Sequence, residues 1–298
     1  MHSSLPQIDS ELLEQVQQFS LRIARAGKGG RLAEQKTNAR GQGLEFADYK
    51  PYVAGDELRA IDWHVYQRLG RLFVRVFEEQ QNLPVYILLD QSASMFVEQP
   101  PRYAAAQQAA LALGAIALNQ QDTVRVLPFA GKLNSQFKSL SGKHQLLQLA
   151  EQLQHTAPHP SSAICQALTE FAAYPLRQGL CVLISDFFNS QDIQHVIDAL
   201  SLVRHQLLLI QLTQPWDASP QLLNISGDVQ FEDSETGTTL DVQLSPAVIS
   251  QYQHAYQQFN TRITQAADEL GAGLCQLDAS AAVLPQLSQL FTQRGLNI

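Results

Sequence analysis

The sequence predicts an α/β fold with a doubly wound, mostly parallel sheet and a small β-rich satellite unit. From residue 84 onward, apolar runs typical of buried strands alternate with segments of helical periodicity, and such alternation favours parallel strands joined by helices. Residues 43–80 have another pattern, because aromatic and β-branched residues gather there and Gly55 and Gly70 mark turns. This second pattern indicates short strands of a separate, smaller unit.

The expected elements follow the chain in order. An amphipathic helix over 12–26 can be capped by Ser10, since serine is a favoured residue at helix starts. The sequence then predicts strands at 84–90, 123–130, 179–186, 206–212 and 273–277 and helices at 103–120, 143–154, 162–174, 191–203, 247–270 and 281–293. Residues 132–140 are expected to return beside the second of these strands, and residues 229–244 to form a hairpin.

These patterns divide the chain into three parts. Residues 1–30 are expected to form an N-terminal helix and linker. Residues 40–82 and 216–245 share a β-rich pattern and are grouped as one satellite unit. Residues 83–215 and 246–298 then make up the α/β domain.

Composition excludes several classes of protein. The formal net charge of −8 and the pI of about 5.4 argue against broad nucleic-acid binding. The three cysteines form no CxxC pair, which indicates a reducing compartment without a disulfide framework. No apolar signal core occurs near the N-terminus, and no apolar run has the length of a membrane span. These observations predict a cytoplasmic protein with no membrane span.

One carboxylate and two hydroxyls follow the first buried strand at every second residue, as Asp90, Ser92 and Ser94. A loop beyond the end of a strand can turn these oxygens toward a common point, and hard cations prefer oxygen ligands. The alternative is that one of these side chains only caps the helix that follows. We therefore predict a divalent metal at these residues, Mg²⁺ first, with Mn²⁺ or Ca²⁺ as alternatives.

A second acid, Asp186, ends another buried strand. In a sheet of order 3-2-1-4-5-6, strands 1 and 4 are neighbours, and ligands bind in the crevice at their carboxyl ends. Asp90 ends strand 1 of the α/β region and Asp186 ends strand 4, so both carboxylates are expected to face one crevice. The alternative role for Asp186 is a cap on the next helix or a bond to loop amides.

These residues resemble the metal-ion-dependent adhesion site of the von Willebrand factor type A fold. That site has the pattern DxSxS after strand 1, a threonine in a middle loop and an aspartate after strand 4. Asp90, Ser92, Ser94 and Asp186 match it as they stand. In the middle loop, Ser162 stands where threonine is usual, and Ser161 is an equal alternative. The resemblance implies a metal-holding domain that binds partners rather than an enzyme.

A longer segment of the sequence resembles a more specific family. The segment GLEFADYKPYVAGDELRAIDWHVYQRLGRLFVRVFEE, followed by PVYILLDQSASM, resembles the bacterial domain of unknown function 58 family, most densely over residues 40–95. The residues that match its motif are Gly55, Asp56, Arg59, Asp62 and Trp63. The resemblance implies a partnership with MoxR-type AAA+ ATPases, whose genes commonly lie beside those of this family.

Three functions from different classes remain open. The leading hypothesis is a metal-dependent protein-binding adapter that works with a MoxR-type AAA+ ATPase or its client in assembly or chaperone-like processes. The rival is a Mg²⁺-dependent phosphohydrolase with Asp90 as nucleophile, although Ser92 stands where a second acid is normal in such enzymes. The third is a metal-free scaffold that binds through its β-rich unit.

Overall fold

The computed structural model describes residues 8, 10–29, 44–79, 82–134, 136–154, 159, 163–188, 192–223, 225 and 227–293. The chain divides into two compact units, one of residues 1–32 and 83–298 and one of residues 33–82. Residues 216–245, which the sequence grouped with residues 40–82, belong to the larger unit. The reason is contact with that unit: the segment lies between β7 (Gln206–Thr213) and α8 (Pro246–Glu269), and its residues Asp217 and Ala218 accept hydrogen bonds from Arg102 and Gln253.

The larger unit is built on a six-stranded sheet of order β10-β7-β6-β3-β4-β5. Its other strands are β3 (Pro84–Asp90), β4 (Thr123–Phe129), β5 (Leu140–Ser141), β6 (Leu180–Ser185) and β10 (Gly273–Asp278). Only β5 runs antiparallel to its neighbour, and every other pair in this sheet is parallel. Numbered within the sheet, this is the doubly wound order 3-2-1-4-5-6. The predicted mixed α/β fold with a mostly parallel sheet is confirmed.

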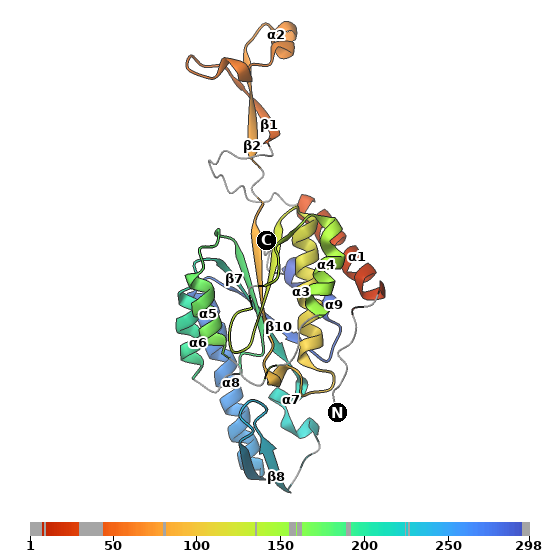
Figure 1. Ribbon diagram of the computed structural model, residues 1–298, viewed down its shortest axis with the longest axis vertical. Coiled ribbons are helices and arrows are strands. Elements are labelled where there is room, and N and C mark those ends of the chain that lie inside the picture. The colour runs from red at the N-terminus through yellow and green to blue at the C-terminus, as the bar shows by residue number, and fades with distance from the viewer. Residues whose placement is uncertain are drawn as a thin grey trace. The chain divides into compact units, whose positions relative to one another are not determined.

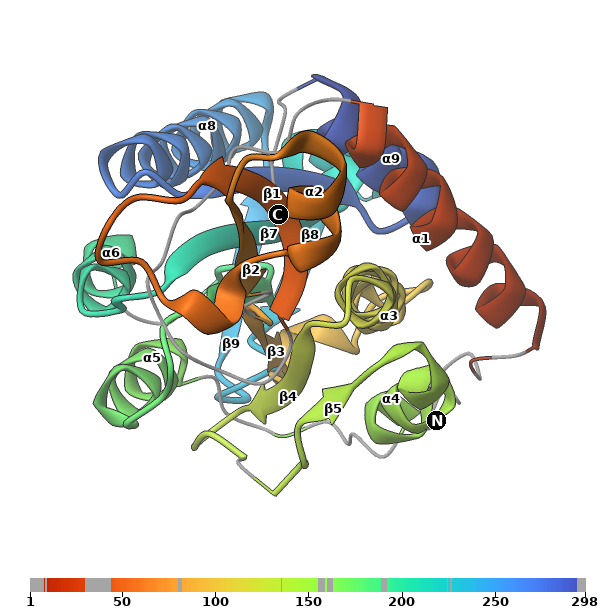
Figure 2. The same ribbon diagram turned by 90° about the horizontal axis from the view of Figure 1, so that it is seen from above.

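Helices cover both faces of this sheet (Figures 1 and 2). One face carries α1 (Ser10–Gly29), α3 (Arg102–Asn119), α4 (Leu146–Gln154) and α9 (Val283–Gln293), and the other carries α5 (Ile164–Ala173), α6 (Ile193–Ser201) and α8. Successive side chains of β3 enter the two cores alternately, with Ile87 in the first core and Leu88 in the second. Since both faces of β3 are buried, its sequence is a continuous apolar run.

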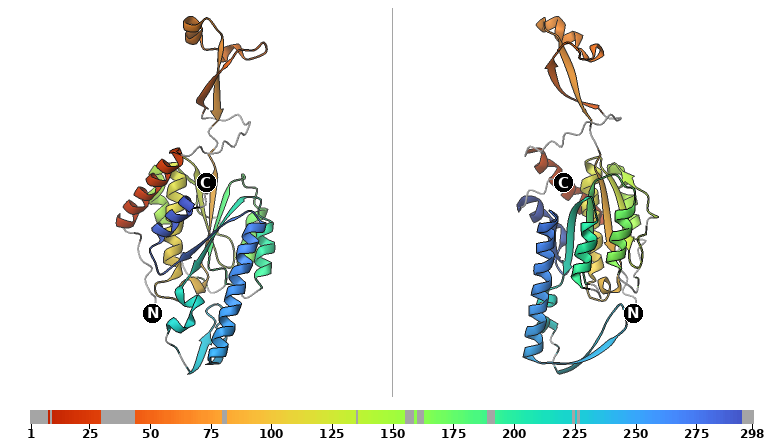
Figure 3. Two further views of the ribbon diagram at one scale, coloured as in Figure 1. Left: turned by 180° about the vertical axis from the view of Figure 1, so that it is seen from behind. Right: turned by 90° about the vertical axis from the view of Figure 1, so that its left-hand side faces the viewer.

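At the carboxyl end of the sheet, the chain leaves β7 through α7 (Pro215–Ala218) and the 3-10 turn η4 (Pro220–Leu223). It then forms β8 (Gly227–Glu232) and β9 (Thr239–Leu244), which pair antiparallel as a separate two-stranded sheet. The predicted hairpin is thus present, and its pairing extends from Gly227 to Leu244. Figure 3 shows the hairpin beside the N-terminal part of α8.

The smaller unit contains β1 (Leu44–Pro51) and β2 (Phe73–Glu79), which pair antiparallel, and α2 (Trp63–Leu69) between them. The sequence predicted the strands but not α2. Asp62 caps this helix, because its carboxylate accepts the backbone N–H groups of His64 at 3.0 Å and Val65 at 3.2 Å. Gly70 ends it with a left-handed φ of 62°. Local capping therefore outweighs the strand-like pattern of this stretch.

Candidate functional site

Two buried carboxylates lie at the carboxyl edge of neighbouring strands. β3 and β6 are parallel neighbours with Leu89 opposite Ile184. Asp90 is the last residue of β3, and Asp186 directly follows the end of β6. Asp90 is 0% exposed and Asp186 is 1% exposed. The strand order therefore brings together the two acids that the sequence placed at one crevice.

Both oxygens of Asp90 accept hydrogen bonds from nearby residues. The backbone N–H of Ser92 donates to Oδ1 at 2.9 Å, and the hydroxyl of Ser185 donates to Oδ2 at 2.6 Å. Burial raises the pKa of the Asp90 carboxyl, and the bonds from Ser185 and Ser92 offset part of this effect. Ser185 was missed by the sequence reading, although its place directly before Asp186 in a buried strand is a usable signal.

The two serines after β3 are not helix caps. Ser92 precedes the short 3-10 turn η2 (Ala93–Met95), but its side chain makes no capping bond there. Its hydroxyl oxygen instead lies 3.0 Å from the hydroxyl oxygen of Ser94. Ser92 is fully buried, and Ser94 is half-buried. The structure thus places the two hydroxyls side by side just beyond the Asp90 carboxylate.

Among the described residues, one oxygen of Asp186 has a hydrogen-bond partner and the other has none. Its Oδ1 accepts the backbone N–H of Phe188 at 3.0 Å, and Asp192, not Asp186, caps α6. Among the described residues, the buried Oδ2 has no hydrogen-bond partner. Burial and the neighbouring charge of Asp90 raise the pKa of Asp186 to about 7, against the lowering influence of Arg102 and Ser94. A buried carboxylate in this condition needs a proton or a cation nearby.

The middle loop reaches this site through His159. Its backbone N–H donates to the carbonyl oxygen of Gln91 at 3.0 Å, and it forms an isolated parallel bridge with Ser92. Ser161 and Ser162 lie outside the described residues. Their part in the site stays a prediction, and only His159 of this loop is described beside the loop after β3.

Arg102, at the first turn of α3, is a buried cation that the sequence reading missed. Its guanidinium group contacts Glu98 through two hydrogen bonds of 2.7 and 2.8 Å and Asp217 of α7 through one of 2.6 Å. It also lies 5.3 Å from the centre of the Phe188 ring. Burial disfavours the charged form of Arg102, but the carboxylates of Glu98, Asp217 and Asp186 outweigh this and raise its pKa. A single charge at the start of the apolar run YAAAQQAALALGAIAL was the available signal.

The donor set contains few carboxylates. Among the described residues, no group of three or more His, Cys, Asp or Glu side chains is arranged to hold a metal ion. The candidate site instead consists of two carboxylates and the hydroxyls of three serines: Asp90, Ser92, Ser94, Ser185 and Asp186. Such a set suits a hard cation that keeps several of its waters rather than a cation that needs a cage of charged ligands.

Three solved structures are distantly similar to this chain. The conserved hypothetical protein BatB from Bacteroides thetaiotaomicron is 16% identical with a TM-score of 0.41, and the match covers 71% of this chain and 100% of that one. An aerotolerance-related membrane protein from Bacteroides fragilis is 18% identical with a TM-score of 0.44, over 71% and 100%. An uncharacterized membrane spanning protein from Vibrio fischeri is 14% identical with a TM-score of 0.24, over 70% and 96%.

The cytoplasmic location expected from the sequence needs correction. Two of the similar structures are described as membrane proteins, and this finding contradicts the expectation. The description itself applies to those two proteins. The expectation rested on the sparse cysteines and on the lack of a signal core or a membrane-span-length apolar run, and none of these identifies a compartment. In the part of the chain that the structure describes, no helix is both long and apolar enough to cross a membrane.

Sequence comparisons identify the family. Uncharacterized proteins of Mycobacterium bovis and Mycobacterium tuberculosis are each 24% identical to this chain over 267 residues, which is 85% of this chain and 80% of theirs. The family model described as "Protein of unknown function DUF58" matches residues 48–262, more than half of the 298 residues. This chain therefore belongs to the DUF58 family.

Proposed function

We propose that this protein is a metal-dependent protein-binding adapter with a von Willebrand factor A-like domain. Its ligand residues are Asp90, Ser92, Ser94 and Asp186, with Ser162 from the middle loop. The metal is Mg²⁺, with Mn²⁺ or Ca²⁺ as the alternatives for the same oxygen ligands. The order of the sheet and the two acids at the carboxyl ends of its central strands support this assignment.

The unpartnered oxygen of Asp186 carries the proposal. Oδ2 is buried and lacks a hydrogen-bond partner among the described residues, and the nearby charge of Asp90 makes its ionised form still less favourable. Native proteins rarely leave such an atom without a partner. A divalent cation beside both carboxylates would satisfy it and stabilise the two ionised side chains together.

In this proposal, some residues of the site orient the two carboxylates and others supply oxygen ligands to the metal. The Ser185 hydroxyl and the Ser92 N–H hold the Asp90 carboxylate in place, and the Phe188 N–H holds Asp186 through its other oxygen. The hydroxyls of Ser92 and Ser94 supply neutral oxygens. A bound metal would supply a positive charge with an open coordination position, which a carboxylate of a protein partner can fill.

The proposed partner is a MoxR-type AAA+ ATPase or its client. The support for this is the resemblance of residues 40–95 to the motif of the family. In this proposal, the adapter links the ATPase to assembly or chaperone-like work. Binding would then require both the metal and an exposed Asp or Glu of the partner.

The residue types favour binding over phosphoryl transfer. A phosphohydrolase of this kind uses one carboxylate as nucleophile and a second carboxylate, two residues later, as acid or base. The position of the usual second acid holds Ser92, whose hydroxyl does not titrate near neutral pH. These observations support the adapter over the phosphohydrolase.

Calorimetric titration with Mg²⁺ and Mn²⁺ tests the proposal. We expect saturable binding by the wild type, and its loss in Asp90→Asn and in Asp186→Asn, which keep the side-chain shape. Asp198→Asn is the matched control, because Asp198 is an exposed acid of α6. Equal binding by all four proteins, or no binding by the wild type, would overturn the metal site.

The partner is tested separately with the purified ATPase. Its affinity for the wild type should fall in excess EDTA and in Asp186→Asn, and should be unchanged in Asp198→Asn. An affinity that is indifferent to EDTA would leave a metal-free scaffold as the better description.

A further inference from the structure

The β8–β9 hairpin is amphipathic across its two faces. The register pairs Val229 with Val242 and Phe231 with Leu240, and paired residues of an antiparallel ladder point to the same side. One face therefore carries Val229, Phe231, Leu240, Val242 and Leu244, and the other carries Asp228, Gln230, Glu232, Thr239, Asp241 and Gln243. Such a division is typical of an antiparallel strand pair that packs its apolar face against another part of a protein.

The apolar face is largely uncovered. Phe231 is 45% exposed and Leu240 is 64% exposed, while Val229, Val242 and Leu244 are half-buried. Among the described residues, no third strand is paired with β8 or β9. An isolated two-stranded hairpin is only marginally stable, and its free edges present backbone groups that can pair with another strand.

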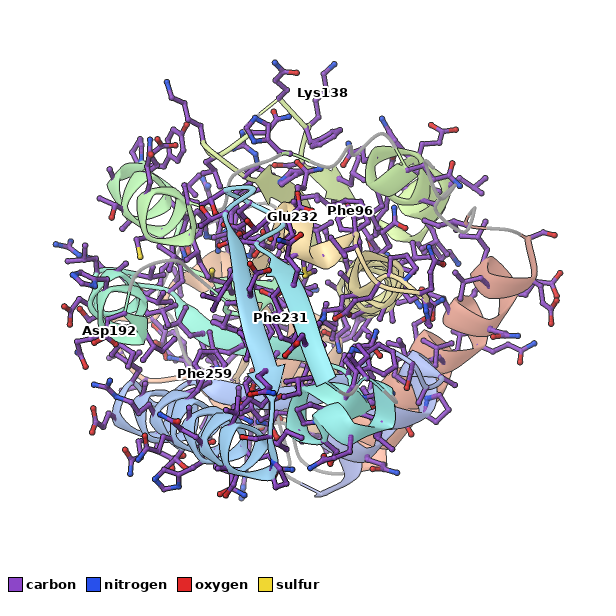
Figure 4. The ribbon with its side chains drawn as sticks, turned by 90° about the horizontal axis from the view of Figure 1, so that it is seen from below. Phe96, Lys138, Asp192, Phe231, Glu232 and Phe259 are labelled. Carbon is purple, nitrogen blue, oxygen red and sulfur yellow. The ribbon has the colours of Figure 1, made fainter. Side chains whose placement is uncertain are left out.

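The root of the hairpin is firmly attached, although the hairpin itself is exposed. Asp217 of α7 is bound to Arg102 at 2.6 Å, and Gln253 of α8 donates to the carbonyl oxygen of Ala218 at 3.2 Å. Ser245 caps α8 directly after β9. Figure 4 shows Phe231 and Glu232 on the hairpin, near the middle of this end of the larger unit. The protein thus presents the hairpin on a fixed base.

The negative charge of the hairpin indicates which kind of partner can bind to it. Residues 227–244 contain five acidic residues, Asp228, Glu232, Asp233, Glu235 and Asp241, and no Lys, Arg or His. Within the described part of the chain, none of Asp228, Glu232 and Asp241 forms a salt bridge. A second copy of this chain would bring two such acidic hairpins together, which like-charge repulsion disfavours. A basic partner meets no such penalty.

We propose that the β8–β9 hairpin binds an extended basic segment of a partner protein, which adds a third strand along a free edge. In such a segment apolar and basic residues alternate. Its apolar side chains continue the face of Phe231 and Leu240, and its lysine or arginine side chains lie on the same face as Asp228, Glu232 and Asp241. Backbone hydrogen bonds supply affinity in this type of recognition, and alternate side chains supply specificity. The proposal does not depend on the metal site.

Binding of two synthetic peptides to the full chain tests this inference. One peptide alternates valine and lysine, and the other has the same composition with the valines and lysines in separate blocks. We expect the alternating peptide to bind more tightly, because only it can place all its lysines on one face of a strand. Its binding should weaken with added salt and should be unchanged by excess EDTA and by Asp90→Asn.

Two sets of variants locate the binding. Asp228→Asn, Glu232→Gln and Asp241→Asn together should weaken binding of the alternating peptide roughly tenfold, since three exposed charge pairs each contribute modestly. The matched control neutralises three exposed acids elsewhere, Glu151→Gln, Asp198→Asn and Asp268→Asn, and should bind as the wild type does. All six positions are exposed, so both variants should keep the melting temperature of the wild type.

A backbone measurement tests strand addition itself. The alternating peptide should slow amide hydrogen exchange within residues 227–244 and leave exchange in β3 unchanged. Equal binding of the two peptides, equal weakening by the two sets of variants, or unchanged exchange in the hairpin would overturn the proposal. Dimerisation of the free protein that is lost in Phe231→Ser would also overturn it, since the occupant would then be a second copy of this chain.

Discussion

The central strands and the β8–β9 hairpin are both β-structure, yet they relate to the rest of the chain in opposite ways. All seven residues of β3 are buried between two layers of helices. In the hairpin, no residue of either strand is buried. The sequences reflect this difference, since PVYILLD is apolar throughout and VQFE and TLDVQL alternate. Apolar content alone does not bury a strand, because burial also requires neighbours that cover it.

The same side chain behaves differently in the two regions. At the edge of the central sheet, burial and Asp90 raise the pKa of Asp186 to about 7. In the turn of the hairpin, the backbone N–H groups of Glu235 and Thr236 donate to Asp233 and lower its pKa. Burial therefore disfavours the ionised form of the carboxylate at the sheet edge, whereas the hairpin displays carboxylates that are stable in water. The two regions suit different ligands.

The largest expected loss of stability follows removal of the buried ion pair between Arg102 of α3 and Asp217 of α7. Arg102→Ala should destabilise the protein by about 3–5 kcal/mol, since it leaves the buried Asp217 carboxylate without its cation. Arg262→Ala is the control, because its pair with Asp192 at 3.3 Å is exposed, and should cost less than about 1 kcal/mol. Urea denaturation measures both. Equal losses would mean that Arg102 does not join α3 to α7 energetically.

The next effect is the pH dependence of stability that Asp186 contributes at the edge of the sheet. A raised pKa in the folded state means that the contribution of Asp186 to stability is complete below the ordinary value of 3.8 and is lost as the pH rises to about 7. In excess EDTA, wild-type stability should therefore fall over this range by as much as about 4 kcal/mol relative to Asp186→Asn. Thermal melts at several pH values measure the difference, and parallel curves for the two proteins would contradict it.

Truncation of a leucine compares the two regions directly. Leu88→Ala in β3, at a side chain that is 0% exposed, should cost about 2–5 kcal/mol through lost burial and a cavity. Leu240→Ala in β9, at a side chain that is 64% exposed, should change stability by less than about 0.5 kcal/mol. Chemical denaturation reports both values. A large loss at Leu240 would show that its face is covered in solution.

The smallest effect should be local to the hairpin. Asp233→Ala removes the acceptor for the N–H groups of Glu235 and Thr236, which holds the turn together. Global unfolding should change by less than about 0.5 kcal/mol, because the hairpin opens without the core. Amide exchange in residues 227–244 should nevertheless become faster. Unchanged exchange there would mean that the strands, not the turn, hold the hairpin.

Much of the fold was predictable because it depends on local patterns. Apolar runs of strand length alternating with helical segments identified the sheet, and the rule for doubly wound sheets correctly made β3 and β6 neighbours. The same rule predicted that Asp90 and Asp186 lie at one edge of the sheet. The helix α2 was not predicted, because it has only seven residues and lies within a stretch with a strand-like pattern. Its caps, Asp62 and Gly70, were the available signal.

The rest depended on contacts between distant parts of the chain. Ser185 donates to Asp90 across 95 positions, and Arg102 reaches Asp217 across 115, and no periodicity encodes such pairs. The sequence alone established which residue types stand at the ends of the strands and which strands have one apolar face. Only the packed chain established that, among the described residues, one buried oxygen of Asp186 has no hydrogen-bond partner and that Phe231 and Leu240 of the hairpin are exposed, because burial depends on the neighbours that folding assembles.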